Sequence, residues 1–263
     1  DIWVLEAGLG GRLDPINCFD AYLSIITNIS LDHQEILGSD TDSIGKEKAG
    51  ILRNNQKLIF GAKKIPESVI KMIDSLNVDL HKIEEQDLEE DLHINNNAVK
   101  IAKKAIELID PKISEKNIFN SIRNTKILGR CDLINNEFLV DVAHNEDAIK
   151  NLKSFIKSRS LDEDGIAAIF HCSKSKNPIS LISPLNKLFS ELRIPRINNF
   201  RLLDEEYIEE SFNNHFEIKV SIDETIEKSI KEIKLLKPES LILIFGSFYL
   251  AGEFYKLPFI KNV

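Results

Sequence analysis

The chain has little positive charge, few cysteines and no long apolar run. Its formal net charge of -8 and pI near 5.4 argue against sequence-independent binding to nucleic acid, because neutralising phosphates needs a basic face. The three cysteines, Cys18, Cys131 and Cys172, form no C-x-x-C pair, so neither a disulfide framework nor a zinc site is expected. No apolar stretch approaches the roughly 20 residues of a membrane span. These absences predict a soluble, cytoplasmic protein that binds neither nucleic acid nor membrane.

Two further absences concern the start of the chain and a phosphate-binding loop. The chain begins without methionine, directly at an apolar segment typical of a buried strand, so we expect an upstream portion to be missing. The pattern G-x-x-x-x-G-K-[ST], which cradles phosphates, occurs nowhere in the sequence. The glycines near the start are therefore not a loop of that kind.

Short apolar runs alternate with stretches of helical period, which predicts an α/β fold with parallel sheets and crossover helices. In the first part we expect strands at residues 2–6, 22–29 and 57–61, helices at 43–52, 67–76 and 95–109, and a loop or irregular strand at 77–91. In the second part we expect strands at 138–142, 166–171, 194–198, 217–220 and 241–245, and helices at 146–158, 179–192, 205–213 and 225–236. The polar segment 117–126 separates the two series, so we predict domains at residues 1–125 and 126–263.

Glu6 stands at the carboxyl end of the first expected strand, directly before a glycine-rich loop that contains Gly8, Gly10 and Gly11. Ligands in open α/β sheets bind outside the carboxyl ends of strands, so Glu6 is placed to hold a cation. The alternative interpretation is a tight turn made by the glycines, with Glu6 as a solvated strand end.

His33 and Lys48 are the next candidates for a metal site. His33 follows the next expected strand at the same sheet edge, where it could share a metal with Glu6; the alternative is a structural histidine. Lys48 lies four residues after Ile44 and three before Ile51, so helical spacing places it on the apolar side of its helix. Burial would lower its pKa, and the neutral amine could react with carbon dioxide to give a carbamate that binds Mg²⁺. The alternative is a lysine with a buried stem and a solvated ammonium.

Three stretches carry a resemblance to a known family: EAGLGGRLD at 6–14, SLDHQEILG at 30–38 and IGKEKAGI at 44–51. Their order and spacing resemble the central ATPase domain of the folylpolyglutamate synthase/dihydrofolate synthase family, within the Mur ligase superfamily. Later stretches are similar to further family motifs: HINNNA at 93–98, LGR at 128–130, LVDVAHN at 139–145 and FGSFYLAGE at 245–253. The resemblance covers essentially the whole chain. It implies the C-terminal part of a Mur-ligase-type central ATPase domain followed by a Rossmann-like C-terminal domain.

The resemblance implies an ADP-forming ligase of folate biosynthesis. Such an enzyme transfers the γ-phosphoryl group of ATP to a carboxylate of dihydropteroate or a folyl-glutamate, and the amine of L-glutamate then attacks the acyl phosphate. The site would lie between the domains and close around its substrates. By analogy with the family we expect a monomer.

The resemblance also assigns roles to individual residues. It implies that Glu6, His33 and carbamylated Lys48 bind Mg²⁺, and that these three residues and His144 take part in catalysis. It implies that ATP is bound by Asn97, Arg130 and Asp141, of which Arg130 has a planar guanidinium suited to phosphate. It implies that the pterin or glutamate substrate is contacted by Leu13, Asp14, Pro15, His144 and Ser247. Taken singly, each of the C-terminal residues could equally be a helix cap or turn residue.

The chain departs from the family pattern at three places. The family's N-terminal phosphate loop is absent, so we expect this polypeptide alone not to turn over ATP. HCSKSKN at 171–177 stands where many relatives carry acidic residues around a lysine. Pro15 occupies a place often taken by alanine beside the pterin, which bears on substrate preference.

Two other functions compete with this prediction. A peptidoglycan-precursor ligase of the same superfamily would join an amino acid to a nucleotide-linked muramyl group, but the GLGGRLD stretch favours folate. A non-catalytic nucleotide-binding remnant would lack a phosphate loop upstream, whereas the enzyme prediction requires one within roughly a domain's length.

Overall fold

The structure is a computed structural model that describes residues 2–83, 94–161 and 165–260. The chain divides into two compact units, Asp1–Asn124 and Thr125–Val263. Both are built from parallel strands joined by helices, which confirms the predicted α/β class. No helix within the described ranges is long and apolar enough to cross a membrane.

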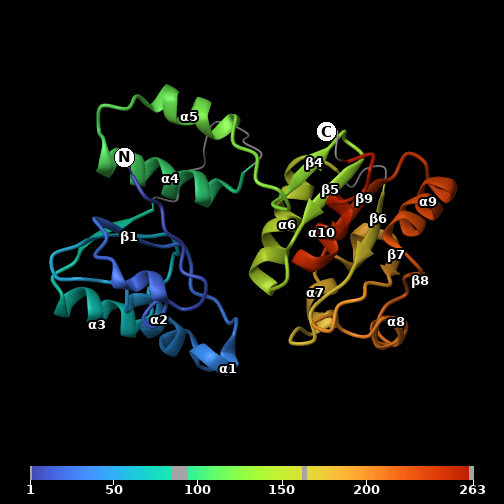
Figure 1. Cartoon of the computed structure of the whole chain (residues 1–263), viewed down its shortest axis with the longest axis horizontal. Coiled ribbons are helices and arrows are strands. Elements are labelled where there is room, and N and C mark those ends of the chain that lie inside the picture. The colour runs from blue at the N-terminus through green and yellow to red at the C-terminus, as the bar shows by residue number, and fades with distance from the viewer. Residues whose placement is uncertain (1, 84–93, 162–164, 261–263) are drawn as a thin grey trace. The chain divides into compact units, whose positions relative to one another are not determined.

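The first unit is built on a parallel sheet with the strand order β1-β2-β3. Its strands are β1 (Leu23–Ile26), β2 (Lys57–Phe60) and β3 (Asp79–Lys82). The crossover helices α2 (Thr41–Ala49) and α3 (Glu67–Ser75) lie together on one side of the sheet (Figure 1). The remaining helices are η1 (Pro15–Cys18), α1 (Gln34–Leu37), α4 (Asn96–Ile109) and α5 (Glu115–Arg123).

Helical spacing of apolar residues explains how these helices pack. Val69 and Ile73 lie one turn apart on α3 and join Leu58 of β2 in a buried core. Ile118 and Ile122 are related in the same way on α5 and form a second core with residues of α4. The polar residues of segment 117–126 predicted a connection between domains, but the segment contains most of helix α5.

The second unit has a larger sheet with the strand order β4-β5-β9-β6-β7-β8. Only β4 runs antiparallel to its neighbour in this sheet, among the described residues. The strands are β4 (Asp132–Ile134), β5 (Phe138–Asp141), β6 (Ile166–Phe170), β7 (Phe189–Pro195), β8 (Val220–Asp223) and β9 (Leu241–Phe245). The helices are α6 (Glu146–Ser158), α7 (Pro178–Ile182), η2 (Asn186–Leu188), α8 (Glu205–Asn213), α9 (Ile226–Leu236) and α10 (Phe248–Tyr255).

Helices cover both faces of this larger sheet. Residues of α6, α7 and α8 share one hydrophobic core with the sheet, and residues of α9 and α10 share the other. The central strands β6 and β9 are buried along their whole length, as parallel strands covered on both faces should be. Because β9 pairs with β5 in parallel, the loops that follow these two strands leave the sheet at the same edge. This edge is where ligands bind in open α/β sheets.

The expected strand at residues 2–6 is wrong. These residues form no strand, and no described strand pairs with them. Trp3 is 77% exposed and makes an edge contact with Phe19 instead. An apolar run becomes a strand only when a neighbour supplies hydrogen bonds, so composition alone could not decide the structure here.

Several expected boundaries in the second unit are also wrong. The helix expected at 179–192 ends at Ile182, because Pro184 cannot continue it, and β7 begins at Phe189. The strand expected at 217–220 is β8, which starts at Val220 where it pairs with Leu192. In the first unit, β3 lies within the stretch expected to be a loop or irregular strand. Residues 84–93, including His93 of the HINNNA motif, lie outside the described residues.

Candidate active site

Hydrogen bonds to the carboxylate of Asp14 hold the glycine-rich loop in its conformation. One carboxylate oxygen accepts a hydrogen bond from the backbone N–H of Gly8 at 2.8 Å, and the other accepts from Ile16 at 3.0 Å. The contact with Ile16, which caps η1, is the main cause that holds the pKa of Asp14 below its usual value. Asp14 therefore shapes the loop from within, whereas its neighbours Leu13 and Pro15 are exposed.

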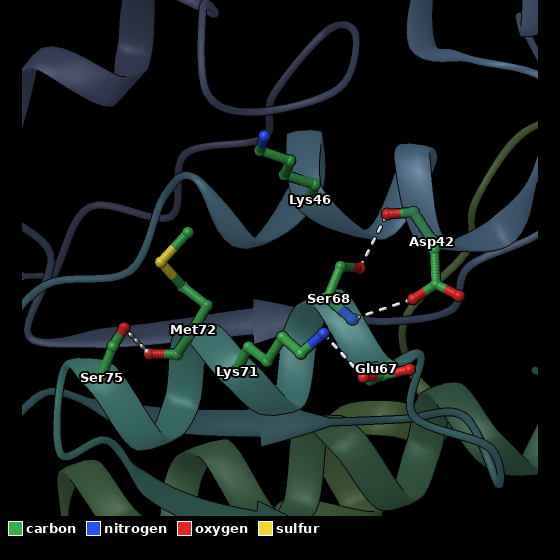
Figure 2. A pocket seen from close by; sticks show the side chains of 7 residues that line it. All are labelled: Asp42, Lys46, Glu67, Ser68, Lys71, Met72 and Ser75. Carbon is green, nitrogen blue, oxygen red and sulfur yellow. Dashed lines mark hydrogen bonds and ion pairs between the residues drawn. The ribbon is translucent and has the colours of Figure 1, made fainter.

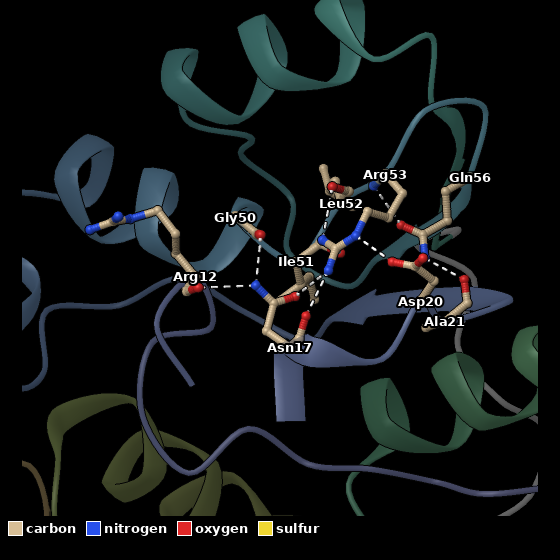
Figure 3. A network of polar contacts seen from close by, with 9 residues as sticks. All are labelled: Arg12, Asn17, Asp20, Ala21, Gly50, Ile51, Leu52, Arg53 and Gln56. Atoms are coloured by element: carbon tan, nitrogen blue, oxygen red, sulfur yellow. Dashed lines mark hydrogen bonds and ion pairs between the residues drawn. The ribbon is translucent and has the colours of Figure 1, made fainter. Parts of the chain in front are cut away.

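Arg53 holds the following part of the same loop (Figure 3). Its guanidinium donates to the backbone carbonyl of Asn17 at 2.7 Å and to the carboxylate of Asp20 at 2.7 Å. The side chain of Asn17 in turn donates to the carbonyls of Arg12 and Gly50, at 3.0 and 3.1 Å. The end of α2 and the loop are thereby tied together. The sequence patterns did not single out Arg53, because a single arginine outside a motif carries no signal of its own.

Asp32 connects His33 and Lys48, two of the predicted metal ligands. Its carboxylate lies 3.9 Å from Nε2 of His33. Lys48 is half-buried on α2, and burial lowers the pKa of its amine while the negative charge of Asp32 opposes that shift. Lys46, two residues earlier on the same helix, is exposed. The structure thus separates the two lysines of the IGKEKAGI stretch in the way that helical spacing predicts.

Glu6 is exposed, and no polar contact in the described ranges joins it to His33 or Lys48. Carboxylate and carbamate oxygens, with one imidazole nitrogen, are donors that a hard divalent cation accepts. Asp32 was missed by the sequence analysis and is a further candidate donor, since it lies next to His33 and its charge acts on Lys48.

A groove of about 530 Å³ opens between α2 and α3 (Figure 2). Its lining residues are Asp42, Lys46, Glu67, Ser68, Lys71, Met72 and Ser75. Many of its polar groups satisfy one another: the backbone N–H of Ser68 donates to Asp42 at 2.8 Å, and Lys71 pairs with Glu67 at 2.6 Å. None of the predicted site residues lines this groove. It is therefore a contact region between two helices rather than a part of the candidate site.

Asn97 lies at the carboxyl end of the smaller sheet. Its side-chain N–H donates to the carbonyl of Gly61, the residue after β2, at 2.9 Å. Asn95 caps the helix by accepting a hydrogen bond from the backbone of Asn97 at 2.9 Å. Gly61 permits this approach, because a Cβ atom there would lie 2.5 Å from Ile101 of α4. These contacts fix Asn97 at the start of α4, beside the end of β2.

Four predicted residues of the second unit lie at one edge of the larger sheet. Asp141 ends β5, His144 lies in the loop that follows, and Ser247 follows the neighbouring strand β9. Arg130 precedes β4, which starts at this edge because it runs antiparallel to β5. The fold therefore brings Arg130, Asp141, His144 and Ser247 to one edge, although more than 100 positions separate the first from the last.

The carboxylate of Asp141 is buried and already accepts hydrogen bonds from the chain. Oδ2 accepts from the backbone N–H of Cys131 at 2.7 Å, and Oδ1 accepts from Ala143 at 2.7 Å. Burial is the main cause that raises the pKa of Asp141, against the opposing effect of these hydrogen bonds. Asp141 thus fixes the segment that carries Arg130.

His144 and Ser247 also have partners of their own. Nδ1 of His144 lies 2.8 Å from the carbonyl of Val142, which places the proton of a neutral ring on Nδ1. The hydroxyl of Ser247 accepts from the backbone N–H of Leu250 at 3.2 Å and caps α10. The capping alternative therefore describes Ser247 correctly, and a hydroxyl that accepts a hydrogen bond can also donate one.

An exposed aromatic ring stands between two of these residues. Phe248, the first residue of α10, is 58% exposed, and its ring centroid lies 5.7 Å from that of His144. The guanidinium carbon of Arg130 lies 5.5 Å from the same ring, within the range of a cation–π contact. The sequence analysis passed over Phe248, although an aromatic residue directly after a capping serine at a strand end was a usable signal.

The HCSKSKN stretch is anchored by its first two residues. His171 is fully buried, its Nε2 lies 3.2 Å from a carboxylate oxygen of Glu205, and burial lowers the pKa of its imidazole. Nδ1 of His171 has no hydrogen-bond partner among the described residues. Cys172 is also buried, which raises the pKa of its thiol to about 12 and makes it inert at neutral pH. Lys174 is exposed.

A cluster of three carboxylates, Asp204, Glu205 and Glu206, occurs at the start of α8. Each already has a partner: Asp204 caps the helix, Glu205 meets His171, and Glu206 pairs with Arg196. These contacts explain the cluster without a metal ion.

Comparison with known proteins relates both units to one family. The family described as "Dihydrofolate synthetase, C-terminal domain" matches residues 131–257. The dihydrofolate synthase/folylpolyglutamate synthase of Buchnera aphidicola subsp. Acyrthosiphon pisum is 32% identical over 287 residues, which cover 98% of this chain and 67% of that protein. The protein of the same name from Haemophilus influenzae is 25% identical, over 97% of this chain and 68% of its own length.

Solved structures share the fold. Escherichia coli FolC in complex with DHPP and ADP matches with a TM-score of 0.85 at 23% identity, over 98% of this chain and 66% of that one. The bifunctional folylpolyglutamate synthase/dihydrofolate synthase of Yersinia pestis, complexed with AMPPNP and Mn ion, matches with a TM-score of 0.82 at 21% identity, over 95% of this chain and 64% of that one. This chain thus spans about two thirds of the length of these relatives.

Proposed function

The chain belongs to the dihydrofolate synthase/folylpolyglutamate synthase family, and on that premise we propose that it is part of an ATP-dependent, ADP-forming ligase of folate metabolism. The observation that carries the proposal is the 32% identity with a family member over 98% of the chain. It includes both units, so the likeness does not rest on one nucleotide-binding domain alone.

The proposed reaction joins L-glutamate to dihydropteroate, to folyl-glutamates or to both. A carboxylate oxygen of the pterin substrate attacks the γ-phosphorus of ATP, and ADP leaves. The glutamate amine then attacks the acyl carbon, an amide forms, and phosphate leaves with the oxygen that came from the carboxylate. Charge builds on the transferring phosphoryl group, so catalysis depends on cationic groups placed around it.

ATP binding is proposed for Asn97, Arg130 and Asp141. Arg130 has no carboxylate partner within the described ranges, so its guanidinium is available to a phosphate. Asp141 acts mainly by fixing the turn beside Arg130, because both of its oxygens accept hydrogen bonds from the chain. Asn97 offers its amide oxygen at the edge of the smaller sheet.

The divalent cation that such a ligase uses with ATP is proposed to bind at Lys48, His33 and Glu6, with Asp32 as an added donor. Lys48 would act as a carbamate, which the half-buried position and lowered pKa of its amine support. When bound, the cation neutralises charge on the phosphates. The residues around it position these donors: Asp32 faces His33, and α2 holds Lys48.

The pterin and glutamate side is proposed to involve the glycine-rich loop and the edge of the larger sheet. Leu13 and Pro15 are exposed on the loop that Asp14 and Arg53 hold in shape, so they can contact a substrate directly. His144, with its proton on Nδ1 in the neutral ring, and the buried Ser247 are proposed to orient the polar part of a substrate.

We propose the domain boundary at residue 125, in line with the two compact units and with a family match that begins at residue 131. A cytoplasmic location is supported by the free state of Cys18, Cys131 and Cys172. A monomer remains our proposal by analogy with the family. A peptidoglycan-precursor ligase is disfavoured, because the relatives described above carry folate-pathway names.

The test is a ligation assay with the purified full-length gene product, ATP and Mg²⁺. We expect release of ADP that requires both L-glutamate and either dihydropteroate or a folyl-glutamate. A requirement for a nucleotide-linked muramyl substrate would favour the competing ligase, and the absence of any ligation would favour a non-catalytic protein.

A further inference from the structure

The hydroxyl of Tyr255 links the end of α10 to the segment 129–132, which lies far away in the sequence. Tyr255 is the last residue of α10, and its oxygen accepts a hydrogen bond from the backbone N–H of Gly129 at 2.7 Å. The same hydroxyl donates to a carboxylate oxygen of Asp132 at 2.6 Å. Burial is the main cause that raises the pKa of Tyr255, and the carboxylate of Asp132 adds to it, so the phenol keeps its proton. The contacted residues flank Arg130 on both sides.

The segment 129–132 has a conformation that needs such support. Gly129 has φ of +68° and Cys131 has φ of +47°, a left-handed conformation that is strained for a residue with a side chain. Such a backbone persists only where its surroundings fix it. Besides Tyr255, residues at the end of β5 support the segment: Asp141 accepts from the N–H of Cys131 at 2.7 Å, and Val142 donates to the carbonyl of Gly129 at 2.9 Å.

Helix α10 contacts Arg130 at its other end as well. The exposed ring of Phe248, its first residue, lies 5.5 Å from the guanidinium carbon of Arg130. One helix therefore holds the backbone of the Arg130 turn through Tyr255 and the side chain through Phe248. The guanidinium forms no ion pair within the described part of the chain, although its charge acts on the carboxylate of Asp141, so its donors can reach an anionic ligand.

We propose that Tyr255 is a positioning residue for Arg130, and that its hydroxyl fixes the turn that presents the guanidinium to the phosphates of ATP. The inference rests on the proposed function, in which Arg130 contacts ATP. Tyr255 itself touches no reacting atom. Its effect passes through Gly129 and Asp132 to the arginine between them, and positioning of this kind limits how much a long side chain must be ordered on binding.

A double-mutant cycle with Arg130 separates this role from a purely structural one. Tyr255→Phe removes only the hydroxyl and keeps the ring, which packs against the core beside Phe254. In the full-length gene product it should raise KM for ATP by roughly 3- to 10-fold, the effect of losing about one hydrogen bond. KM for L-glutamate should stay within about twofold. When Arg130 is already alanine, Tyr255→Phe should change KM for ATP no further.

Tyr207→Phe is the matched control, because Tyr207 is an exposed tyrosine on α8, away from the Arg130 turn. Amide hydrogen exchange at Gly129 and Cys131 gives a readout that does not depend on catalysis, and Tyr255→Phe should accelerate it. If Tyr255→Phe does not fold, Asp132→Asn weakens the same contact and replaces it in the cycle.

Two results would overturn the inference: an unchanged KM for ATP in Tyr255→Phe, or equal effects of that substitution with and without Arg130. Failure of the proposed function looks different. In that case the unsubstituted protein shows no ATP-dependent ligation at all, while hydrogen exchange still responds to the loss of the hydroxyl.

Discussion

At the scale of single residues, burial distinguishes side chains that the sequence presents as equivalent. Lys46 and Lys48 lie two positions apart on α2, yet the first is exposed and only the second has a pKa lowered by burial. His171 and His215 both lie in the second unit, but only His171 is buried, where Nε2 faces Glu205. Burial therefore favours the neutral amine at Lys48 but not at Lys46.

Lys48→Ala tests the proposed carbamate. The substitution should reduce kcat of ligation by more than the roughly 100-fold typical of residues that merely support a metal ligand, because it removes the ligand itself. Small carboxylates such as formate should restore part of the activity by occupying the vacated space. Lys46→Ala, on the exposed side of the same helix, is the control and should leave kcat nearly unchanged. Full activity of Lys48→Ala without any added carboxylate would contradict the proposed carbamate.

His171 should make the stability of the second unit depend on pH. Its folded-state pKa is lowered by burial, so the unfolded chain binds the proton more tightly than the folded chain does. The free energy of unfolding should therefore be constant above the unfolded-state pKa of about 6.5 and should fall as pH drops below it towards the folded-state pKa. The neighbouring charges of Glu205 and Arg196 set how far this decline extends.

Urea unfolding at several pH values measures this dependence. His171→Gln should flatten the decline between pH 6.5 and 5, while His215→Gln, at an exposed position, should not. An unchanged slope in His171→Gln would show that another group dominates acid destabilisation.

At the scale of elements, the sequence predicted the helices and buried strands whose pattern is local. The strand around 166–171 and the helices around 146–158 and 225–236 are found close to their expected bounds, because apolar periodicity and capping residues act within one segment. The strand at 2–6 was not found, because strand formation depends on a partner that composition does not reveal. The strand β4 was missed because it has only three residues, although it pairs with the next strand β5 across a short turn. Short elements such as α7 are set by single residues, here Pro184.

The candidate site was predictable to a similar degree. Asp141 and Ser247 lie at the expected edge of the larger sheet and Asn97 at that of the smaller one, because these strand ends can be read from the sequence, whereas the strand expected to carry Glu6 is not found. Arg53 and Tyr255 were missed because they act through contacts between segments that are distant in sequence. Asp32 and Phe248 belong to the stretches 30–38 and 245–253, but no role was assigned to them because only the structure shows their neighbours. Conversely, Asp14 and Ser247 lie where the motifs predict, and the structure gives them capping roles as well.

Arg53→Lys tests whether the contacts of Arg53 with Asn17 and Asp20 hold the glycine-rich loop in its conformation. Lysine keeps the charge but cannot reproduce the forked contacts with Asn17 and Asp20, so the free energy of unfolding should fall by roughly 1–3 kcal/mol. Limited proteolysis should then cut the loop faster. Arg12→Lys is the control, because Arg12 pairs with Glu47 through a largely exposed contact and should matter little. Equal proteolysis of the two variants would mean that Arg53 does not organise the loop.

At the scale of the whole molecule, the acidic charge bears on the proposed binding of anionic ligands. The net charge of -8 repels nucleotides and carboxylates at long range, so the proposed ATP binding would depend on local cations such as Arg130, which forms no ion pair among the described residues. Two compact units, each with polar residues at the carboxyl edge of its sheet, provide such groups on a shared α/β plan. Family membership then relates both edges to one ligase reaction.

The central claim, ligation through an acyl phosphate, is tested most directly by following a carboxylate oxygen. Dihydropteroate or folyl-glutamate labelled with ¹⁸O in the reacting carboxylate is incubated with the full-length gene product, ATP and L-glutamate, and the released phosphate is analysed by mass spectrometry. The account predicts one ¹⁸O atom in each phosphate, because that oxygen attacks phosphorus and later leaves with it. Phosphate without label, or label in AMP, would contradict it.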